Sequence, residues 1–423
     1  MTSTGSSAAG TSRSAEAERA AVVSPEALEV LVRVLRARGY QVIGPTVRDG
    51  AIVYDEIDGA GRLPAGWTDV QDAARYRLER RGDDARFGYA VGPHSWKQFL
   101  LPPRLRLLRA HRAEHSAAGP GDADGLAESG VPGGFMVEEE PVPSTPMALL
   151  GVRSCELRAI AVQDRILAGR SGAGAPADRD YAARRDRLFI VAVNCHEPGG
   201  TCFCVSMGTG PAVGNGYDLV LTELLAGEHR LLVEAGTEPG AEVLAEITGE
   251  AASAARAVAP ADRAAAQASI EGAAARMGRE VQAEGLRDLL ADNLEHPRWD
   301  EVADRCLTCG NCTMVCPTCF CVTVEDVGDL AGGAAERWRT WESCFSLDHS
   351  YLHGGAVRAA PRARYRQWLT HKFGTWHDQF GESGCVGCGR CITWCPVGID
   401  VTEELAAIRA DPAPAAPGGS AGS

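Results

Sequence analysis

The stretch Cys306-Leu307-Thr308-Cys309-Gly310-Asn311-Cys312-Thr313-Met314-Val315-Cys316-Pro317 has a near copy later in the chain, Cys385-Val386-Gly387-Cys388-Gly389-Arg390-Cys391-Ile392-Thr393-Trp394-Cys395-Pro396. Both copies place two residues between each of the first three cysteines, three residues before the fourth, and a proline directly after it. Together they account for eight of the fifteen cysteines in the chain. Thiols repeated at such a spacing indicate a metal-binding unit in the C-terminal part of the fold.

The spacing is that of a ferredoxin with two 4Fe-4S cubanes. Three thiolates with two residues between each can wrap one cubane in a tight loop, and the fourth, just before the proline, points to the other cluster. We therefore expect a first cluster with the ligands Cys306, Cys309, Cys312 and Cys395. We expect a second cluster with the ligands Cys316, Cys385, Cys388 and Cys391. The glycines within the motifs fit this prediction, because a backbone that winds round a cluster needs positive φ and close approach.

Zinc is the alternative metal for these thiols. Paired Cys-x2-Cys knuckles also make tetrahedral sites with four thiolate ligands. A third cysteine two residues further on, followed by Cys-Pro, is surplus to a zinc knuckle and required by a cubane. The pattern favours iron-sulfur clusters over a zinc-stabilised scaffold.

Length and composition restrict the functions open to the whole chain. With 423 residues, 45% of them hydrophobic, the chain can form two or three domains. The net charge of −14 argues against a nucleic-acid partner. No stretch approaches the roughly 20 apolar residues of a membrane span, and the N-terminus has no apolar signal core, so we expect a cytoplasmic protein with reduced, metal-bound thiols.

Composition and periodicity predict an α/β (α+β) N-terminal region followed by a helical ferredoxin-like C-terminal domain that binds two 4Fe-4S clusters. Helical apolar spacing covers residues 25–38 and 156–167, and short strands are predicted at 41–43, 51–54, 147–152 and 188–193. The expected order is a disordered tail (1–24), a small α/β unit (25–112), a flexible linker or loop (113–145), an α/β domain with a Cys-rich loop (146–248), a helical connector (249–298), the two-cluster domain (299–410) and a second disordered tail (411–423).

A second repetition involves cysteines outside the two motifs. Thr201-Cys202-Phe203-Cys204-Val205 recurs as Thr318-Cys319-Phe320-Cys321-Val322. In open α/β sheets ligands gather at the carboxyl ends of strands, and two further cysteines each follow a predicted strand closely. A third 4Fe-4S cluster is therefore a candidate, with the ligands Cys155, Cys195, Cys202 and Cys204. The alternative is that these thiols pack as small hydrophobic side chains.

The remaining cysteines and a run of basic residues lie between the two motifs. Packing beside the first cluster is the favoured interpretation of Cys319 and Cys321; weak donation to its sulfurs, or a further site with Cys344, is the alternative. A stretch without acidic residues contains Arg358, Arg362, Arg364, Arg366 and Lys372. These cations either form a solvated helix face or offset cluster charge and tune its reduction potential.

Several motifs of catalytic subunits are absent from the sequence. There is no G-x-G-x-x-G after a predicted strand, no Walker loop, no G-x-S-x-G elbow and no pair of Cys-x2-Cys motifs near opposite ends of the chain. We therefore expect the catalytic centre to belong to another chain.

The C-terminal motifs, together with Trp341-Glu342-Ser343-Cys344 and His371-Lys372-Phe373, closely resemble the beta subunit of cytoplasmic nickel-iron hydrogenases, also called sulfhydrogenases. The related A subunit of anaerobic sulfite reductase is similar. The resemblance extends upstream through Gly92-Pro93-His94-Ser95-Trp96-Lys97, Gly151-Val152-Arg153-Ser154-Cys155 and Thr201-Cys202-Phe203-Cys204, so it covers most of the chain.

The resemblance implies an electron-transfer subunit of an oxidoreductase complex. It would relay electrons between a flavin- and NAD(P)-binding subunit and the small subunit of a nickel-iron hydrogenase, whose large subunit is the further partner. The A subunit of a sulfite reductase complex is the alternative. A hypothesis from a different class is a catalytic redox protein with its own substrate or flavin site in the α/β domain, formed by Cys155, Cys195 and Lys97.

Overall fold

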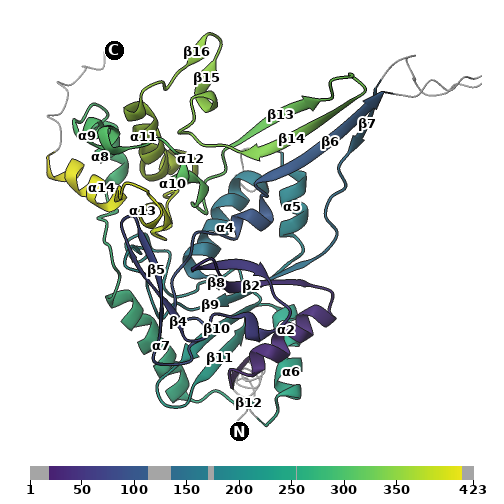
Figure 1. The fold of residues 1–423 in the computed structure, drawn as a ribbon. Helices are drawn as coiled ribbons and strands as arrows, with labels where there is room; N and C mark the ends of the chain where they lie inside the picture. The colour runs from purple at the N-terminus through teal and green to yellow at the C-terminus, as the bar shows by residue number, and fades with distance from the viewer. Residues whose placement is uncertain (1–18, 113–134, 170–175, 254, 412–423) are drawn as a thin grey trace, which may run out of the picture.

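The computed structural model describes residues 19–112, 135–169, 176–253 and 255–411. Most of the two expected tails and residues 113–134 of the expected linker lie outside this part of the chain. The fold is mixed α/β, with a large sheet and its helices in the lower half of Figure 1 and the cysteine motifs among short helices above it.

One eight-stranded sheet forms the base of the molecule. Its strand order is β12-β1-β11-β10-β9-β8-β2-β3, and the four strands β10, β9, β8 and β2 run parallel to one another. The strands are β1 (Ala20–Val23), β2 (Gln41–Arg48), β3 (Ala51–Glu56), β8 (Met147–Arg153), β9 (Leu188–Val193), β10 (Leu219–Leu224), β11 (Arg230–Ala235) and β12 (Ala255–Arg256). The predicted strands at 41–43, 51–54, 147–152 and 188–193 are confirmed.

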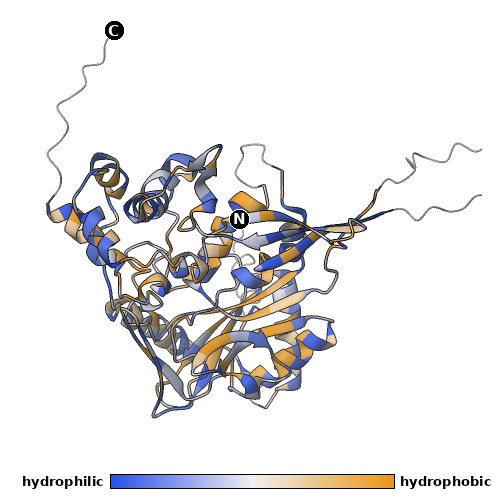
Figure 2. Cartoon of the chain, turned by 45° about the horizontal axis from the view of Figure 1, so that its top comes forward, coloured by the Kyte–Doolittle hydropathy of each residue, from blue (hydrophilic) through white to orange (hydrophobic). Residues whose placement is uncertain are grey.

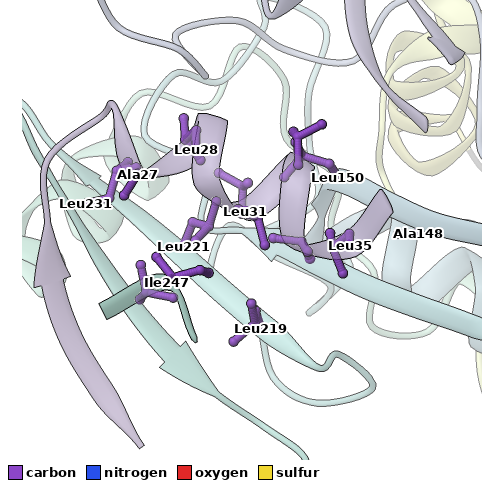
Figure 3. Packing of buried hydrophobic residues seen from close by; sticks show 14 of the residues in the cluster. Ala27, Leu28, Leu31, Leu35, Ala148, Leu150, Leu219, Leu221, Leu231 and Ile247 are labelled. Carbon is purple, nitrogen blue, oxygen red and sulfur yellow. The ribbon is translucent and has the colours of Figure 1, made fainter. Parts of the chain in front are cut away.

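Helices cover both faces of this sheet. Figure 3 shows Leu28, Leu31 and Leu35 of α2 (Ala27–Ala37) packed against Leu219 and other strand residues, with Ile247 of α6 (Glu238–Glu250) beside them. On the other face lie α4 (Ser154–Leu167), α5 (Arg179–Arg185) and α3 (Lys97–Leu100). Alternate strand residues point to opposite faces, so each parallel strand contributes to both cores. Figure 2 shows the resulting concentration of hydrophobic residues along the inner strands.

The structure differs in two places from the division into units that the sequence predicts. Ala20–Val23, expected within the N-terminal tail, is a buried strand that pairs with β11 and β12. The segments 25–112 and 146–248, expected as separate units, share the sheet, because β2 pairs with β8. Apolar periodicity predicts strands but carries no information on which strands pair, so sequence reasoning could not join the two segments.

A second sheet links the N-terminal region to the C-terminal one. Its antiparallel strands follow the order β13-β14-β6-β7. They are β13 (Val322–Gly328), β14 (Ala334–Trp341), β6 (Arg104–Arg112) and β7 (Phe135–Glu139). Phe135–Glu139 was expected in a linker and is an edge strand here. The sheet projects as the arm at the upper right of Figure 1.

Short elements carry or support the cysteine motifs. They are α8 (Leu286–Asp292), α9 (Arg298–Arg305), α10 (Asn311–Met314), α11 (Pro361–Thr370), the π-helical segment η3 (His371–Thr375), α12 (Trp376–Phe380), α13 (Arg390–Thr393) and α14 (Val401–Ala410). The remaining elements are the hairpins β4 (Trp67–Asp72) with β5 (Arg75–Arg80) and β15 (Tyr351–Leu352) with β16 (Gly355–Ala356), the single turns η1 (Ala60–Arg62) and η2 (Asp348–Ser350), and α7 (Pro260–Ala275). In the described ranges, no helix has the length and apolar character needed to cross a bilayer.

Candidate functional site

The thiols of the two motifs line two neighbouring cavities. The first cavity is lined by Cys306, Cys309, Cys312, Cys395 and Cys391. The second is lined by Cys316, Cys385, Cys388 and Cys391. The fourth cysteine of each motif therefore lies at the cavity of the other motif, which is the crossed arrangement expected from the spacing.

Glycines in left-handed conformation let the motif backbone turn around each cavity. Gly310 (φ 74°) directly precedes α10 and Gly389 (φ 74°) directly precedes α13, and each follows a cysteine. Backbone amides in the loops then point at sulfur: the N–H groups of Thr308, Gly387 and Ile399 donate to the motif cysteine two or four residues before them, at 3.4, 3.4 and 3.3 Å. Donors of this kind stabilise the negative charge of a cluster and its thiolates.

The four other candidate cysteines meet at a third cavity. It is lined by Cys155, Cys195, Cys202 and Cys204, and also by Cys388 of the second motif. Cys155 lies in the first turn of α4, and Cys195 lies just after β9, so both are at carboxyl ends of parallel strands. Burial raises the pKa of Cys155 and Cys202 well above its ordinary value, and that of Cys204 to about 12.

The three cavities form a row because they share cysteines. Cys391 lines both the first and the second cavity, and Cys388 lines both the second and the third. The second cavity is therefore the middle one, and is called the middle cavity below. Cys309 at the first cavity is exposed, as is its neighbour Leu307, at 61%. One end of the row reaches the surface.

A cubane and a single metal ion need different arrangements of thiols. Across the described residues, no three His, Cys, Asp or Glu side chains converge closely enough to hold one metal ion. A structural zinc draws its four sulfurs to about 2.3 Å from one atom. A cubane spaces its thiolates further apart, because each binds a different iron. The four or five thiols around each cavity fit a cluster of this kind.

The three remaining cysteines, Cys319, Cys321 and Cys344, form hydrogen bonds with other thiols. A hydrogen bond from Cys319, together with the charge of Lys372, lowers the pKa of Cys316 well below its usual range, although burial acts in the opposite direction. Cys344 donates to Cys321 and lowers the pKa of that thiol in the same way. Packing beside the first cluster was the expectation, but Cys319 instead contacts a thiol of the middle cavity.

Lys372 is the member of the basic stretch that reaches a candidate ligand. Its Nζ donates to the Sγ of Cys316 at 3.2 Å and to the Oγ1 of Thr318 at 2.9 Å. Burial alone would lower the pKa of Lys372, but the neighbouring thiols raise it well above its usual value. Arg362 and Arg366 of the same stretch pair with Glu295 at the surface.

Arg390 is a residue whose role the sequence reasoning missed. Its guanidinium is fully buried and donates from Nη2 to Glu156 at 2.5 Å, and from Nε and Nη2 to the carbonyls of Gly92 and His94 at 2.9 and 2.8 Å. The available signal was a charged residue inside an otherwise apolar cysteine motif, in Cys388-Gly389-Arg390-Cys391.

Lys97, Cys155 and Cys195 do not form a common site. The Nζ of Lys97 donates to the carbonyl of Met314 at 3.4 Å and lies 3.8 Å from the centre of the Trp341 ring, among C-terminal residues. Cys155 and Cys195 lie together at the third cavity. The geometry therefore gives no support to a catalytic site built from these three residues.

Comparison with known proteins places the sequence among iron-sulfur subunits. A family model described as a 4Fe-4S dicluster domain matches residues 305–399. The chain is similar to the protein named sulfhydrogenase 2 subunit beta from Pyrococcus furiosus, with 34% identity over 361 residues. The alignment covers 84% of this chain and 95% of that relative.

Proposed function

The chain belongs to the family of the sulfhydrogenase beta subunits, and on that premise we propose that it is an iron-sulfur electron-transfer subunit of a nickel-iron hydrogenase complex. The observation that carries the proposal is the row of three cavities, each lined by four or five cysteine thiols. Electron carriers placed in a row inside one subunit form a path between its surfaces. The similarity to a hydrogenase subunit favours this complex over a sulfite reductase.

We assign the cluster ligands from the cavities that the thiols line. Cys306, Cys309, Cys312 and Cys395 hold a 4Fe-4S cluster in the first cavity. Cys316, Cys385, Cys388 and Cys391 hold one in the middle cavity. The third cavity holds a third cluster on Cys155, Cys195, Cys202 and Cys204. One fact supports the third assignment: the four thiols come from three separate segments of the chain to one cavity.

Each cluster supplies the uptake and release of one electron when it is bound. The protein's own residues exclude water and fix the order of the centres. Phe345, Trp368 and Ile399 close the first cavity, and Phe203 lies against the middle one. Backbone amides and buried cations face the sulfurs, so that the negative charge of the ligands is balanced within the protein.

The exposed end of the row indicates where another subunit exchanges electrons with this one. The exposed Cys309 and Leu307 mark the first cavity as the end at which electrons are exchanged with another subunit. A flavin- and NAD(P)-binding subunit and the hydrogenase small subunit are the proposed partners, with hydrogen chemistry on the large subunit. We propose a cytoplasmic location for the complex.

Iron analysis of anaerobically purified protein tests this function. Three clusters require about twelve irons per chain, and two require about eight. Zinc in place of iron would contradict the relay. Cys202→Ala is expected to remove about four irons and one cluster signal. Cys344→Ser is the matched control, because this thiol lines none of the three cavities and should leave the iron content unchanged.

A further inference from the structure

Two buried cations lie on different elements near the thiols of the middle cavity: Lys372 contacts one of them, and Arg390 lies within the second motif. Lys372, on η3, is 7% exposed and donates to the Sγ of Cys316. Among the described residues no carboxylate forms an ion pair with it; its hydrogen bonds go to that sulfur and to the hydroxyl of Thr318. A buried ammonium is costly unless it is paired with negative charge. The compensating charge must therefore come from the sulfur ligands of this cavity.

Arg390 provides the second cation. It lies between Cys388 and Cys391 in the chain, and its charge lies close to the Cys388 thiol. Its Nη1 is buried and has no hydrogen-bond partner among the described residues. A buried donor without a partner costs about 1–3 kcal/mol. Arg390 does not itself line the middle cavity, but its charge lies beside Cys388, which is a candidate ligand there.

The first cavity has a different environment. Apart from its cysteines, it is lined by apolar and aromatic residues such as Phe345, Trp368 and Ile399, and no charged side chain of the described residues is among them. The third cavity has one cation in its lining, Arg153, whose guanidinium donates to the carbonyls of Phe87 and Tyr89. Direct contact between a lysine ammonium and a candidate ligand sulfur occurs at the middle cavity.

We propose that Lys372 is a redox-tuning residue, which, together with the charge of Arg390 beside Cys388, raises the reduction potential of the cluster in the middle cavity above the value that its thiolates alone would give. This inference rests on the proposed function, since it requires a cluster on Cys316, Cys385, Cys388 and Cys391. Reduction adds one negative charge to a cluster, and a fixed cation or an N–H donor at its sulfurs stabilises that form. The middle of the row then retains an electron more readily than it would without these cations.

The test is a redox titration of the full-length, anaerobically purified chain, followed by electron paramagnetic resonance. Lys372→Gln keeps a hydrogen-bond donor and removes the charge. We expect one cluster to shift to more negative potential by at least a tenfold change in its reduction equilibrium, which is about 59 mV for one electron. The shifted cluster should be the one whose signal is missing in Cys385→Ala.

Two matched variants separate charge from structure. Lys372→Arg keeps the charge and should return the potential toward that of the unaltered protein. Arg366 lies on α11, the helix directly before η3, and pairs with Glu295 at the surface. Arg366→Gln removes this cation and should shift the potential of no cluster. The proposal is wrong if Lys372→Gln binds its full iron and no potential moves, or if the cluster that is missing in Cys309→Ala moves equally.

A further variant decides the matter if Lys372→Gln fails to bind iron. Lys372→Met removes the charge and fills the same buried volume with apolar atoms, so the middle cluster should again shift to more negative potential; no change would overturn the proposal. Failure of the proposed function is distinguishable, because it would appear as fewer than eight irons in the unaltered protein. Full iron content with an unmoved potential would reject the tuning role alone.

Discussion

Glu156 joins the two halves of the molecule through its carboxylate. It accepts hydrogen bonds from the hydroxyl of Tyr54, the indole of Trp96 and the guanidinium of Arg390. These donors come from β3, from the loop before α3 and from the second cysteine motif. The glutamate and arginine side chains are 1% and 0% exposed. Such a pair holds α4, which carries Cys155, against α13, which carries Cys391.

Glu156→Gln should destabilise the protein strongly. Removing one partner of a buried ion pair leaves the other charge without compensation, at a cost of about 3–5 kcal/mol. The measurement is the midpoint of chemical unfolding under anaerobic conditions. Glu250→Gln is the control, because Glu250 pairs with Arg33 at the surface. The unfolding midpoint of this variant should hardly change. Equal midpoints for the two variants would show that the buried pair contributes no special stability.

Two loops interlock at the level of the elements. The loop that carries Cys202 and Cys204 packs against the second motif, since the N–H of Phe203 donates to the carbonyl of Gly387 at 2.9 Å. The hydroxyls of Thr201 and Thr393 lie 2.7 Å apart. A Cβ at Gly389 would lie 2.4 Å from the carbonyl oxygen of Thr201. Glycine is required there by both the close approach and the positive φ.

Gly389→Ala should therefore damage two cavities at once. The new methyl group would meet backbone, which cannot move aside as a flexible side chain can, so the second motif and the loop at 201–204 must separate. We expect loss of iron from the middle and the third cavity. Gly381→Ala is the control: its φ is 72°, but a Cβ there has open space, so only the left-handed strain of about 1–2 kcal/mol remains. Iron loss in both variants alike would contradict the interlock.

The whole molecule places the row of cavities between its large sheet and its surface. The third cavity lies at the carboxyl ends of β8 and β9, and the first reaches solvent at Cys309. The sheet of β13, β14, β6 and β7 ties both regions together, because β14 pairs with β6 over residues more than two hundred positions apart. The row is thus held by long-range strand pairing and by the buried ion pair.

Leu307→Glu should slow electron exchange with the partner subunit at the first cavity. The leucine is 61% exposed at the cavity rim, and a carboxylate there would oppose docking of an apolar surface. Iron content and unfolding should stay unchanged, while the rate of cluster reduction in the assembled complex should fall. Leu330→Glu, at the exposed turn between β13 and β14, is the control. If the first cluster is reduced equally fast in both variants, electrons enter elsewhere.

The sequence by itself predicted the eight motif thiols and their crossed sets, because cysteines separated by two or three residues can take few positions relative to one another. It also predicted the strands and helices whose apolar periods are local. The third set of thiols could be suggested only from the echoed Thr-Cys-Phe-Cys and from positions after strands.

Tertiary structure alone decided what depends on distant contacts. It joined 25–112 and 146–248 in one sheet, brought Cys155 and Cys195 to the loop at 201–204, and placed Cys388 between two cavities. It also selected Lys372 from a run of similar cations and paired Arg390 with Glu156, 234 positions away. The physical reason is that burial and charge pairing arise from packing, and local sequence spacing does not specify which segments pack together.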